Sequence, residues 1–325
     1  IIIMRAAVLY KLGSPKFVSD FVVPTPANDQ QVVVKVLTST IKQLDRSKAN
    51  GKHYLAYKEF PCTVGVDGVA QLDDGTLIYA MGITGMLAEK AVVTKNKWTV
   101  LDKGSDPQVA AALPNAVLGA AMALKERAQI KPNDVVLING ATGFTGKLAV
   151  QLARLYGASK VYATGRNETA LKELKEELGA DQVFKIDQPD DVLIDQFKQL
   201  HKTTPIDIVI DYLYSKPLEL IITALSTSGA GHHRTRIVTV GEMAGPTINI
   251  KSATLRSTGI ELMGSGFGSY PANGIELFIN ENINQLLKEN REGRLKVPIF
   301  VSPLEDIEST WDKSTEEGRV VVQIS

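Results

Sequence analysis

The sequence has 325 residues, and its 36 Lys and Arg balance 36 Asp and Glu, so the formal net charge is zero. This balance excludes a broad electrostatic attraction to nucleic acid or to an anionic membrane. One cysteine, Cys62, and four histidines exclude an intramolecular disulfide and a multi-cysteine zinc lobe, and they leave little scope for a His-rich metal centre.

We expect a soluble, cytoplasmic protein. At the start of the sequence the apolar residues precede Arg5, which is the reverse of the order in a secretory signal peptide. The most apolar stretch, residues 109–124, is interrupted by Pro114. It is also shorter than the roughly 20 apolar residues that a membrane helix needs.

Short β-branched or alternating segments, separated by Gly, Pro and Asp, fill the first hundred residues. They predict strands at residues 4–10, 31–37, 65–72 and 77–80. Residues 73–76, Asp-Asp-Gly-Thr, have the composition of a hairpin turn between the last two strands. Because no long helical period occurs there, the segment predicts an antiparallel, barrel-like β domain.

From about residue 108 the sequence alternates between strands and helices. Two alanine-rich helices, separated by Pro114, are predicted at residues 108–113 and 117–127. Strands follow at 135–139, 160–164, 182–185, 206–211, 236–240 and 259–264, and helices at 145–156, 168–178, 192–201 and 216–225. Because each strand is nearly all apolar, the pattern predicts a buried, doubly wound parallel sheet with right-handed crossovers.

The remaining residues predict one helix, at 272–291, and two short strands, at 297–301 and 319–323. These are too few elements for a third domain, so we expect them to complete the N-terminal β domain. The predicted fold class is therefore α/β, with one domain inserted into another. The expected boundaries are 4–116 for the β domain, 117–265 for the dinucleotide-binding domain and 266–325 for the C-terminal segment.

A glycine-rich turn joins the strand at 135–139 to the following helix. A tight turn of this kind aims the helix N-terminus at a diphosphate, and its missing side chains let the ligand approach the backbone. We expect every residue of the turn to bind the cofactor: Gly140, Ala141, Thr142, Gly143, Phe144, Thr145 and Gly146. A structural turn without a ligand is the alternative interpretation.

The second strand of this sheet ends in Thr164, Gly165 and Arg166. An NAD site normally has an acidic side chain here to hold the ribose hydroxyls. A guanidinium instead pairs with a 2′-phosphate, which a carboxylate would repel. These residues therefore predict NADPH as the cofactor. The alternative is that Arg166 is only a solvated loop charge.

Several segments, in order, resemble the zinc-independent quinone reductase branch of the medium-chain dehydrogenase/reductase superfamily. They are residues 110–114, 131–138, 149–154, 178–181, 206–211 and 236–241. The resemblance implies a chaperonin-10 (GroES)-like catalytic barrel, a Rossmann domain and an active site between them. It also implies hydride transfer from NADPH to a quinone or to the C=C bond of an enal or enone, often by a homodimer.

The chain departs from the family pattern at positions near the expected chemistry. Val66 and Asp67 follow Gly65 where zinc-using relatives have Gly-His-Glu, so we expect no metal. Lys42 replaces a usual asparagine, and Gly119 replaces a usual threonine. Within the turn Phe144 and Thr145 replace a small residue and a valine, and residues 169–171 lack the lysine that helps relatives to bind phosphate.

Reduction of an activated double bond needs a donor for the charge that develops on the carbonyl oxygen. Lys42 and Tyr54 are the candidates, with a solvated surface lysine and a packing tyrosine as the respective alternatives. Val240 and Gly241, at the end of the fifth sheet strand, are expected beside the nicotinamide. Phe267, in a glycine-rich loop, is expected near the cofactor or the cleft.

Two other functions come into question. The turn also matches the fingerprint of short-chain reductases, but that family normally opens with this motif, and here about 130 residues precede it, so we set that family aside. An NADPH-binding sensor with little turnover stays open, because Lys42 and Gly119 both depart from the family near the expected chemistry.

Overall fold

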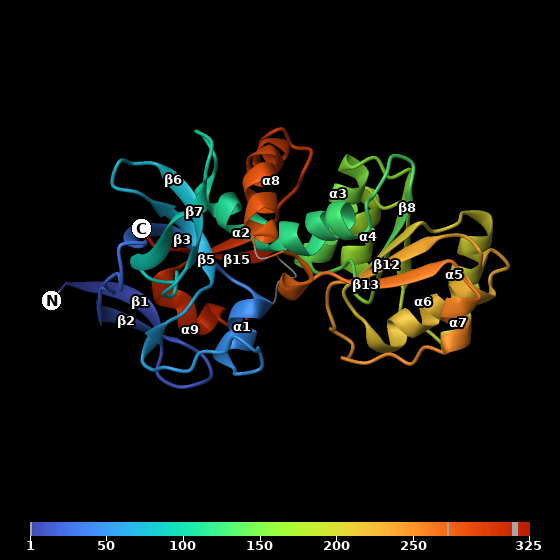
Figure 1. Cartoon of the computed structure of the whole chain (residues 1–325), viewed down its shortest axis with the longest axis horizontal. Helices are drawn as coiled ribbons and strands as arrows, with labels where there is room; N and C mark the ends of the chain where they lie inside the picture. Colours follow the sequence, from blue (N-terminus) through green and yellow to red (C-terminus); the bar gives the residue numbers. More distant parts are fainter. Residues whose placement is uncertain (1, 272, 314–317) are drawn as a thin grey trace. The chain divides into compact units, whose positions relative to one another are not determined.

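The computed structural model describes residues 2–271, 273–313 and 318–325, except for the side chain of Phe267. The chain divides into two compact units, which Figure 1 colours along the sequence. The barrel unit comprises Ile1–Asn115 and Glu276–Ser325, and the parallel-sheet unit comprises Ala116–Ile275. Residues 266–275 thus group with the parallel sheet, whereas the sequence assigned them to the C-terminal segment of the barrel.

The barrel unit contains a six-stranded sheet in the order β14-β15-β3-β5-β6-β7 and a small sheet in the order β2-β1-β4. Its strands are β1 (Ile3–Leu9), β2 (Lys16–Val22), β3 (Gln31–Ile41), β4 (Cys62–Thr63), β5 (Asp67–Gln71), β6 (Leu77–Gly82), β7 (Lys90–Val100), β14 (Ile299–Pro303) and β15 (Arg319–Gln323). Because β3 pairs with both β5 and β7, strands β3, β5, β6 and β7 close into a ring. This confirms the barrel-like β domain that the sequence predicts.

The C-terminal segment returns to the barrel, as its apolar strands lead one to expect. Strand β15 pairs antiparallel with β3, and β14 pairs parallel with β15. The helical elements here are α1 (Gln43–Ala49), α8 (Gly274–Arg291), α9 (Ile307–Thr310) and the 3-10 turn η3 (Leu304–Asp306). Helix α8 is tied to β7, since Asn284 Nδ2 donates to the carbonyl of Val100 over 3.0 Å.

The two helices predicted on either side of Pro114 are one continuous segment, which corrects the expectation. Helix α2 (Pro107–Val117) contains Pro114 and passes directly into a π-helix, η1 (Leu118–Arg127). Most of its alanines and leucines are fully buried, so packing outweighs the cost of an internal proline. Pro107–Arg127 is long and apolar enough to cross a membrane, but 72% of its most apolar 18-residue segment is buried within the structure.

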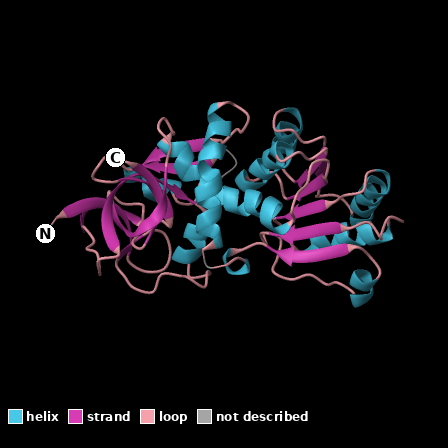
Figure 2. Ribbon diagram, turned by 45° about the horizontal axis from the view of Figure 1, so that its top comes forward, coloured by secondary structure: helices cyan, strands magenta, loops and turns pink. Residues whose placement is uncertain are grey.

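The parallel-sheet unit is a six-stranded sheet in the order β10-β9-β8-β11-β12-β13, with every neighbouring pair parallel. Figure 2 shows helices on both of its faces, which confirms the doubly wound fold. The strands are β8 (Val135–Asn139), β9 (Lys160–Gly165), β10 (Gln182–Lys185), β11 (Ile208–Asp211), β12 (Thr235–Thr239) and β13 (Ile260–Gly264). The helices are α3 (Phe144–Leu155), α4 (Glu168–Glu176), α5 (Asp190–Thr203), α6 (Ser215–Thr227), α7 (Ser252–Arg256) and the 3-10 turn η2 (Phe267–Ser269).

The direction of winding reverses between β8 and β11, which are neighbours in the sheet but not in the sequence. Ligands of open α/β sheets bind outside the carboxyl ends of the strands at such a switch point. The glycine-rich turn starts where β8 ends, so the topology brings it to this position.

Candidate cofactor site

The three glycines of the turn, at positions 140, 143 and 146, have different structural roles. Gly140 has φ of 85°, a left-handed conformation that favours glycine. A Cβ on Gly146 would lie 2.6 Å from the Cα of Ala141, so this glycine lets α3 pack against the turn. A Cβ on Gly143 would meet no atom within 4 Å. Gly143 is the N-cap of α3, so open space lies beside a helix terminus whose first amides lack intrahelical partners.

Thr164 fixes the turn through hydrogen bonds to its backbone. Its hydroxyl accepts from the amide of Gly140 over 2.9 Å and donates to Asn139 Oδ1 over 2.7 Å. Its carbonyl accepts from the amide of Ala141 over 2.7 Å. A Cβ on Gly165 would lie 2.2 Å from Thr142 Cγ2. The sequence predicts cofactor contact for Thr164 and Gly165, but the structure buries both beneath the turn, where they set its shape.

Gly119 and Thr145, which both depart from the family pattern, lie close together. A Cβ on Gly119 would lie 3.0 Å from the Cγ2 methyl of Thr145, so a larger residue at 119 would press on the turn. The hydroxyl of Tyr212 donates to the carbonyl of Gly119 over 2.7 Å, which fixes this part of η1. Phe144 is only 3% exposed and packs into the interior, so only its backbone is placed to face a ligand.

Arg166 is the exposed cation at the end of β9. It precedes Asn167, the N-cap of α4, whose Oδ1 accepts from the amide of Ala170 over 2.9 Å. Among the described residues Arg166 forms no salt bridge, whereas Lys147 pairs with Glu173 over 2.7 Å. Arg166 is therefore placed to meet a phosphate without first breaking an ion pair.

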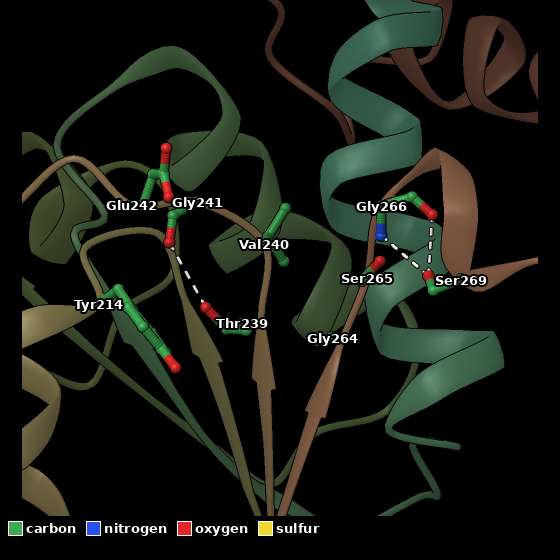
Figure 3. Close-up of a pocket in the computed structure, with 9 residues that line it drawn as sticks. All are labelled: Tyr214, Thr239, Val240, Gly241, Glu242, Gly264, Ser265, Gly266 and Ser269. Carbon is green, nitrogen blue, oxygen red and sulfur yellow. Dashed lines mark hydrogen bonds between the residues drawn. The ribbon is translucent and has the colours of Figure 1, made fainter. Parts of the chain in front are cut away.

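A cavity of about 460 Å³ lies at the carboxyl ends of β12 and β13 (Figure 3). It is lined by Tyr214, Thr239, Val240, Gly241, Glu242, Gly264, Ser265, Gly266 and Ser269. Val240 and Gly241, which the sequence predicts beside the nicotinamide, both line it. A Cβ on Gly241 would lie 2.8 Å from the carbonyl oxygen of Tyr212, so the wall is closely packed. The side chain of Phe267, which the sequence predicts near the cofactor or the cleft, lies outside the described part of the chain.

The sequence interpretation missed a smaller cavity of about 160 Å³ on the β8 and β10 side of the switch point. Its lining is mostly apolar: Asn139, Ile186, Asp190, Leu193, Phe197, Lys216, Pro217 and Leu220. Lys216 and Asp190 form a salt bridge over 2.6 Å. The cavity could have been predicted from Asn139 and Ile186, which both lie at the ends of predicted strands. Two cavities thus lie along the edge that carries the glycine-rich turn.

Lys42 corrects both sequence interpretations of that residue. It is 1% exposed, and its ammonium contacts Asp67 Oδ1 at 2.8 Å, Thr40 Oγ1 at 2.9 Å and Asp45 Oδ2 at 3.1 Å. Burial disfavours the charge, but the carboxylates of Asp45 and Asp67 prevail and raise the pKa of Lys42 above its usual value. Lys42 is therefore neither a solvated lysine nor a donor turned toward a substrate.

Asp45 and Asp67 are held by further hydrogen bonds in the same interior cluster. Asp45 Oδ1 accepts from the amide of Val66 over 2.9 Å, and Asp67 Oδ2 accepts from the hydroxyl of Tyr79 over 3.0 Å. Asp45 thereby ties α1 to the segment before β5, the loop-fixing role expected of it. In the described part of the chain no three His, Cys, Asp or Glu side chains are grouped to hold a metal ion.

Tyr54, the other candidate donor, is 71% exposed in the barrel unit. Its ring stacks on that of His53, with the centroids 4.2 Å apart. A contact with substrate stays a prediction for this residue.

Comparison with known proteins places these features in a family. A family profile described as zinc-binding dehydrogenase matches residues 145–281. Quinone oxidoreductase of Sus scrofa is 28% identical over 273 residues, which cover 80% of this chain and 79% of that protein. The mitochondrial enoyl-[acyl-carrier-protein] reductase of Arabidopsis thaliana is 25% identical over 333 residues, which cover 95% of this chain and 84% of that protein.

A solved structure agrees over the whole length. The quinone oxidoreductase of Thermus thermophilus, described alone and in complex with NADPH, aligns with a TM-score of 0.77 at 26% identity. The alignment covers 98% of this chain and 100% of that chain. The chain belongs to the quinone oxidoreductase-like branch of the medium-chain dehydrogenase/reductase superfamily, whose relatives named here are oxidoreductases.

Proposed function

We propose that the protein is a metal-free oxidoreductase that uses NADPH to reduce a quinone or the C=C bond of an α,β-unsaturated carbonyl. The observation that carries this proposal is the turn at residues 140–146, which leaves open space at Gly143 beside the N-terminus of α3. Support for the substrate class comes from the names of the relatives, which include quinone oxidoreductases and an enoyl reductase.

The two cavities fit the two ends of a dinucleotide. The amides at the start of α3 would bind the diphosphate, and the cavity lined by Val240 and Gly241 would take the nicotinamide. The smaller, apolar cavity would take the adenine, with Arg166 binding the 2′-phosphate. When bound, the reduced nicotinamide supplies a hydride to the acceptor carbon, and water completes the reduction by supplying a proton.

The remaining functional expectations stay predictions. Tyr54 would border the substrate, and Lys42 would serve the interior of the barrel unit rather than the reaction. A zinc-free mechanism is proposed because the position of the usual zinc-binding Gly-His-Glu motif here carries Val66 and Asp67, the latter bound to Lys42. A cytoplasmic homodimer without nucleic acid or membrane partners also stays a prediction.

Replacing Arg166 with alanine tests the cofactor assignment. A charge-assisted pair with the 2′-phosphate contributes about 1.5–3 kcal/mol, so NADPH affinity should fall roughly 10- to 100-fold. NADH affinity should change less than about twofold, because NADH has no 2′-phosphate for Arg166 to bind. Fluorescence titration of both cofactors measures the two effects.

Lys172→Ala is the control, because Lys172 is an exposed lysine of the neighbouring α4 and pairs with Glu176 over 3.8 Å. That variant should bind NADPH like the wild type. Tighter binding of NADH than of NADPH by the wild type would contradict the assignment, as would equal losses for both cofactors in Arg166→Ala.

The second candidate function is an NADPH-binding sensor with little turnover. The burial of Lys42 favours it, since this residue supplies no donor at the position where the family usually has an asparagine. A panel of quinones and enones, followed by NADPH absorbance, separates the two functions. We expect saturable NADPH oxidation with at least one member of the panel. Tight NADPH binding without oxidation across the panel would favour the sensor.

A further inference from the structure

Asp211 is a buried carboxylate at the switch point of the parallel sheet. It ends β11 and is fully buried. Its Oδ1 accepts from Asn139 Nδ2 over 2.7 Å and from the amide of Leu213 over 3.2 Å. Its Oδ2 accepts from the amide of Tyr214 over 3.1 Å and from Thr239 Oγ1 over 3.3 Å. The carboxylate thus joins β8, β12 and the turn that leads into α6.

Among the residues that the structure describes, Asp211 has no cationic partner. Each of its hydrogen-bond partners is a neutral donor, and within the described ranges Asp211 takes part in no salt bridge. Burial raises the pKa of Asp211, and the donated hydrogen bonds oppose that shift. Amide groups that can only donate face both oxygens, and this arrangement favours the ionised carboxylate.

This carboxylate lies directly behind the wall of the larger cavity. Tyr214 and Thr239, which both donate to it, are among the lining residues in Figure 3. Tyr214 has φ of 59° and ψ of −159°, a conformation that residues other than glycine rarely adopt. Two contacts from its amide, one to each oxygen of Asp211, hold it there. The amide of Val240 is also bonded to the Asp211 carbonyl, over 2.7 Å.

We propose that Asp211 stabilises, through its charge, the oxidised form of a nicotinamide bound in this cavity relative to the reduced form. The inference rests on the proposed function. When a hydride leaves with its electron pair, the ring changes from neutral to singly positive, while the phosphates keep their charge. A fixed, buried negative charge favours the positive ring, so it makes the bound reduced cofactor a stronger hydride donor. Asp211 acts at a distance and touches no reacting atom.

Asp211→Asn removes the charge and can keep the hydrogen bonds to Oδ1, while the bond from the Tyr214 amide to Oδ2 is lost. The amide oxygen at the Oδ1 position still accepts from Asn139, Leu213 and Tyr214, and the amide nitrogen faces the Thr239 hydroxyl, which can accept. The dissociation constants of NADPH and NADP⁺ are measured separately, by calorimetry on the full chain at fixed pH and salt. We expect the ratio Kd(NADP⁺)/Kd(NADPH) to rise about three- to tenfold, which is the size of one partly screened charge interaction.

Control variants separate the effect of the charge of Asp211 from the effect of the shape of its side chain. Thr239→Val removes one bond to Asp211 and keeps the charge, so it should leave the ratio within about twofold of the wild type. Asp211→Glu keeps the charge and should do the same, even where both affinities fall. Asp211→Ser also removes the charge and replaces Asp211→Asn in the measurement, with the same expected rise, if the asparagine variant does not fold.

Equal weakening of NADPH and NADP⁺ in the charge-removing variants, or no change in either, would overturn the inference and leave the proposed function standing. Failure of the wild type to bind both forms would overturn the proposed function and this inference together.

Discussion

Replacing Gly143 with alanine should weaken NADPH binding by about tenfold or more while leaving the stability of the parallel-sheet unit almost unchanged. Gly143 has φ of −82°, which alanine adopts without strain, and its added methyl would meet no protein atom within 4 Å. The loss of a glycine N-cap costs at most about 1 kcal/mol. The methyl therefore enters the space through which a diphosphate would approach the amides of α3. Fluorescence titration and thermal unfolding measure the two quantities.

Gly146→Ala is the matched comparison, because it adds the same methyl three residues later. Here the added atom would lie 2.6 Å from the Cα of Ala141, so backbone must shift. Overpacking of this kind costs about 1–3 kcal/mol, so this variant should lose both stability and binding. Gly143→Ala with wild-type affinity for NADPH would show that the open space at the turn is not where the cofactor binds.

Replacing Lys42 with methionine should lower the free energy of unfolding by about 3–5 kcal/mol, since it removes the cation that directly contacts two buried carboxylates. The contacts of Lys42 with Asp45 and Asp67 are both at or below 3.1 Å, and all three side chains are buried. Because the folded state raises the pKa of Lys42, this contribution is complete below the ordinary lysine pKa and declines as pH rises above it. Urea unfolding at neutral and alkaline pH measures both effects.

Lys48→Met controls for the loss of a lysine from the same helix, α1. Lys48 contacts the ring of Tyr57, with the ammonium 4.9 Å from the centroid, so its removal should cost about 1 kcal/mol or less. Combining Lys42→Met with Asp67→Asn should recover part of the lost stability, because one of the stranded charges is then gone. A loss below about 1 kcal/mol in Lys42→Met would contradict a buried ion cluster.

The parallel sheet was predictable because its burial on both faces leaves a local trace in the sequence. Most of its strands are short runs of apolar residues, and a helix-like sequence pattern follows most of them. The glycine-rich turn was predictable for the same reason, since its strand, turn and helix are consecutive. The barrel unit was harder. Strands β2 and β7 were missed, because both mix exposed and charged residues with apolar ones and are defined by their partners.

Pro114 shows the limit of local propensity. A proline inside a helical pattern predicts a break, yet the alanines around it are buried on several sides and keep the helix continuous. The pairing of Gly119 with Thr145 shows the same limit for specificity. Each is a departure from the family pattern when taken alone, and only their proximity shows that the two fit together.

The sequence by itself determined the fold class, the position of the glycine-rich turn and the presence of Arg166 at the end of its strand, because these depend on residues close together in the chain. Only the tertiary structure decided which charges are paired, because ion pairs and hydrogen bonds join distant segments. Lys42 meets Asp67 across 25 positions and lies in the interior, and Asp211 meets Asn139 across 72 positions. Burial strengthens the electrostatic interactions of such charges, and the local sequence does not indicate which polar side chains are buried.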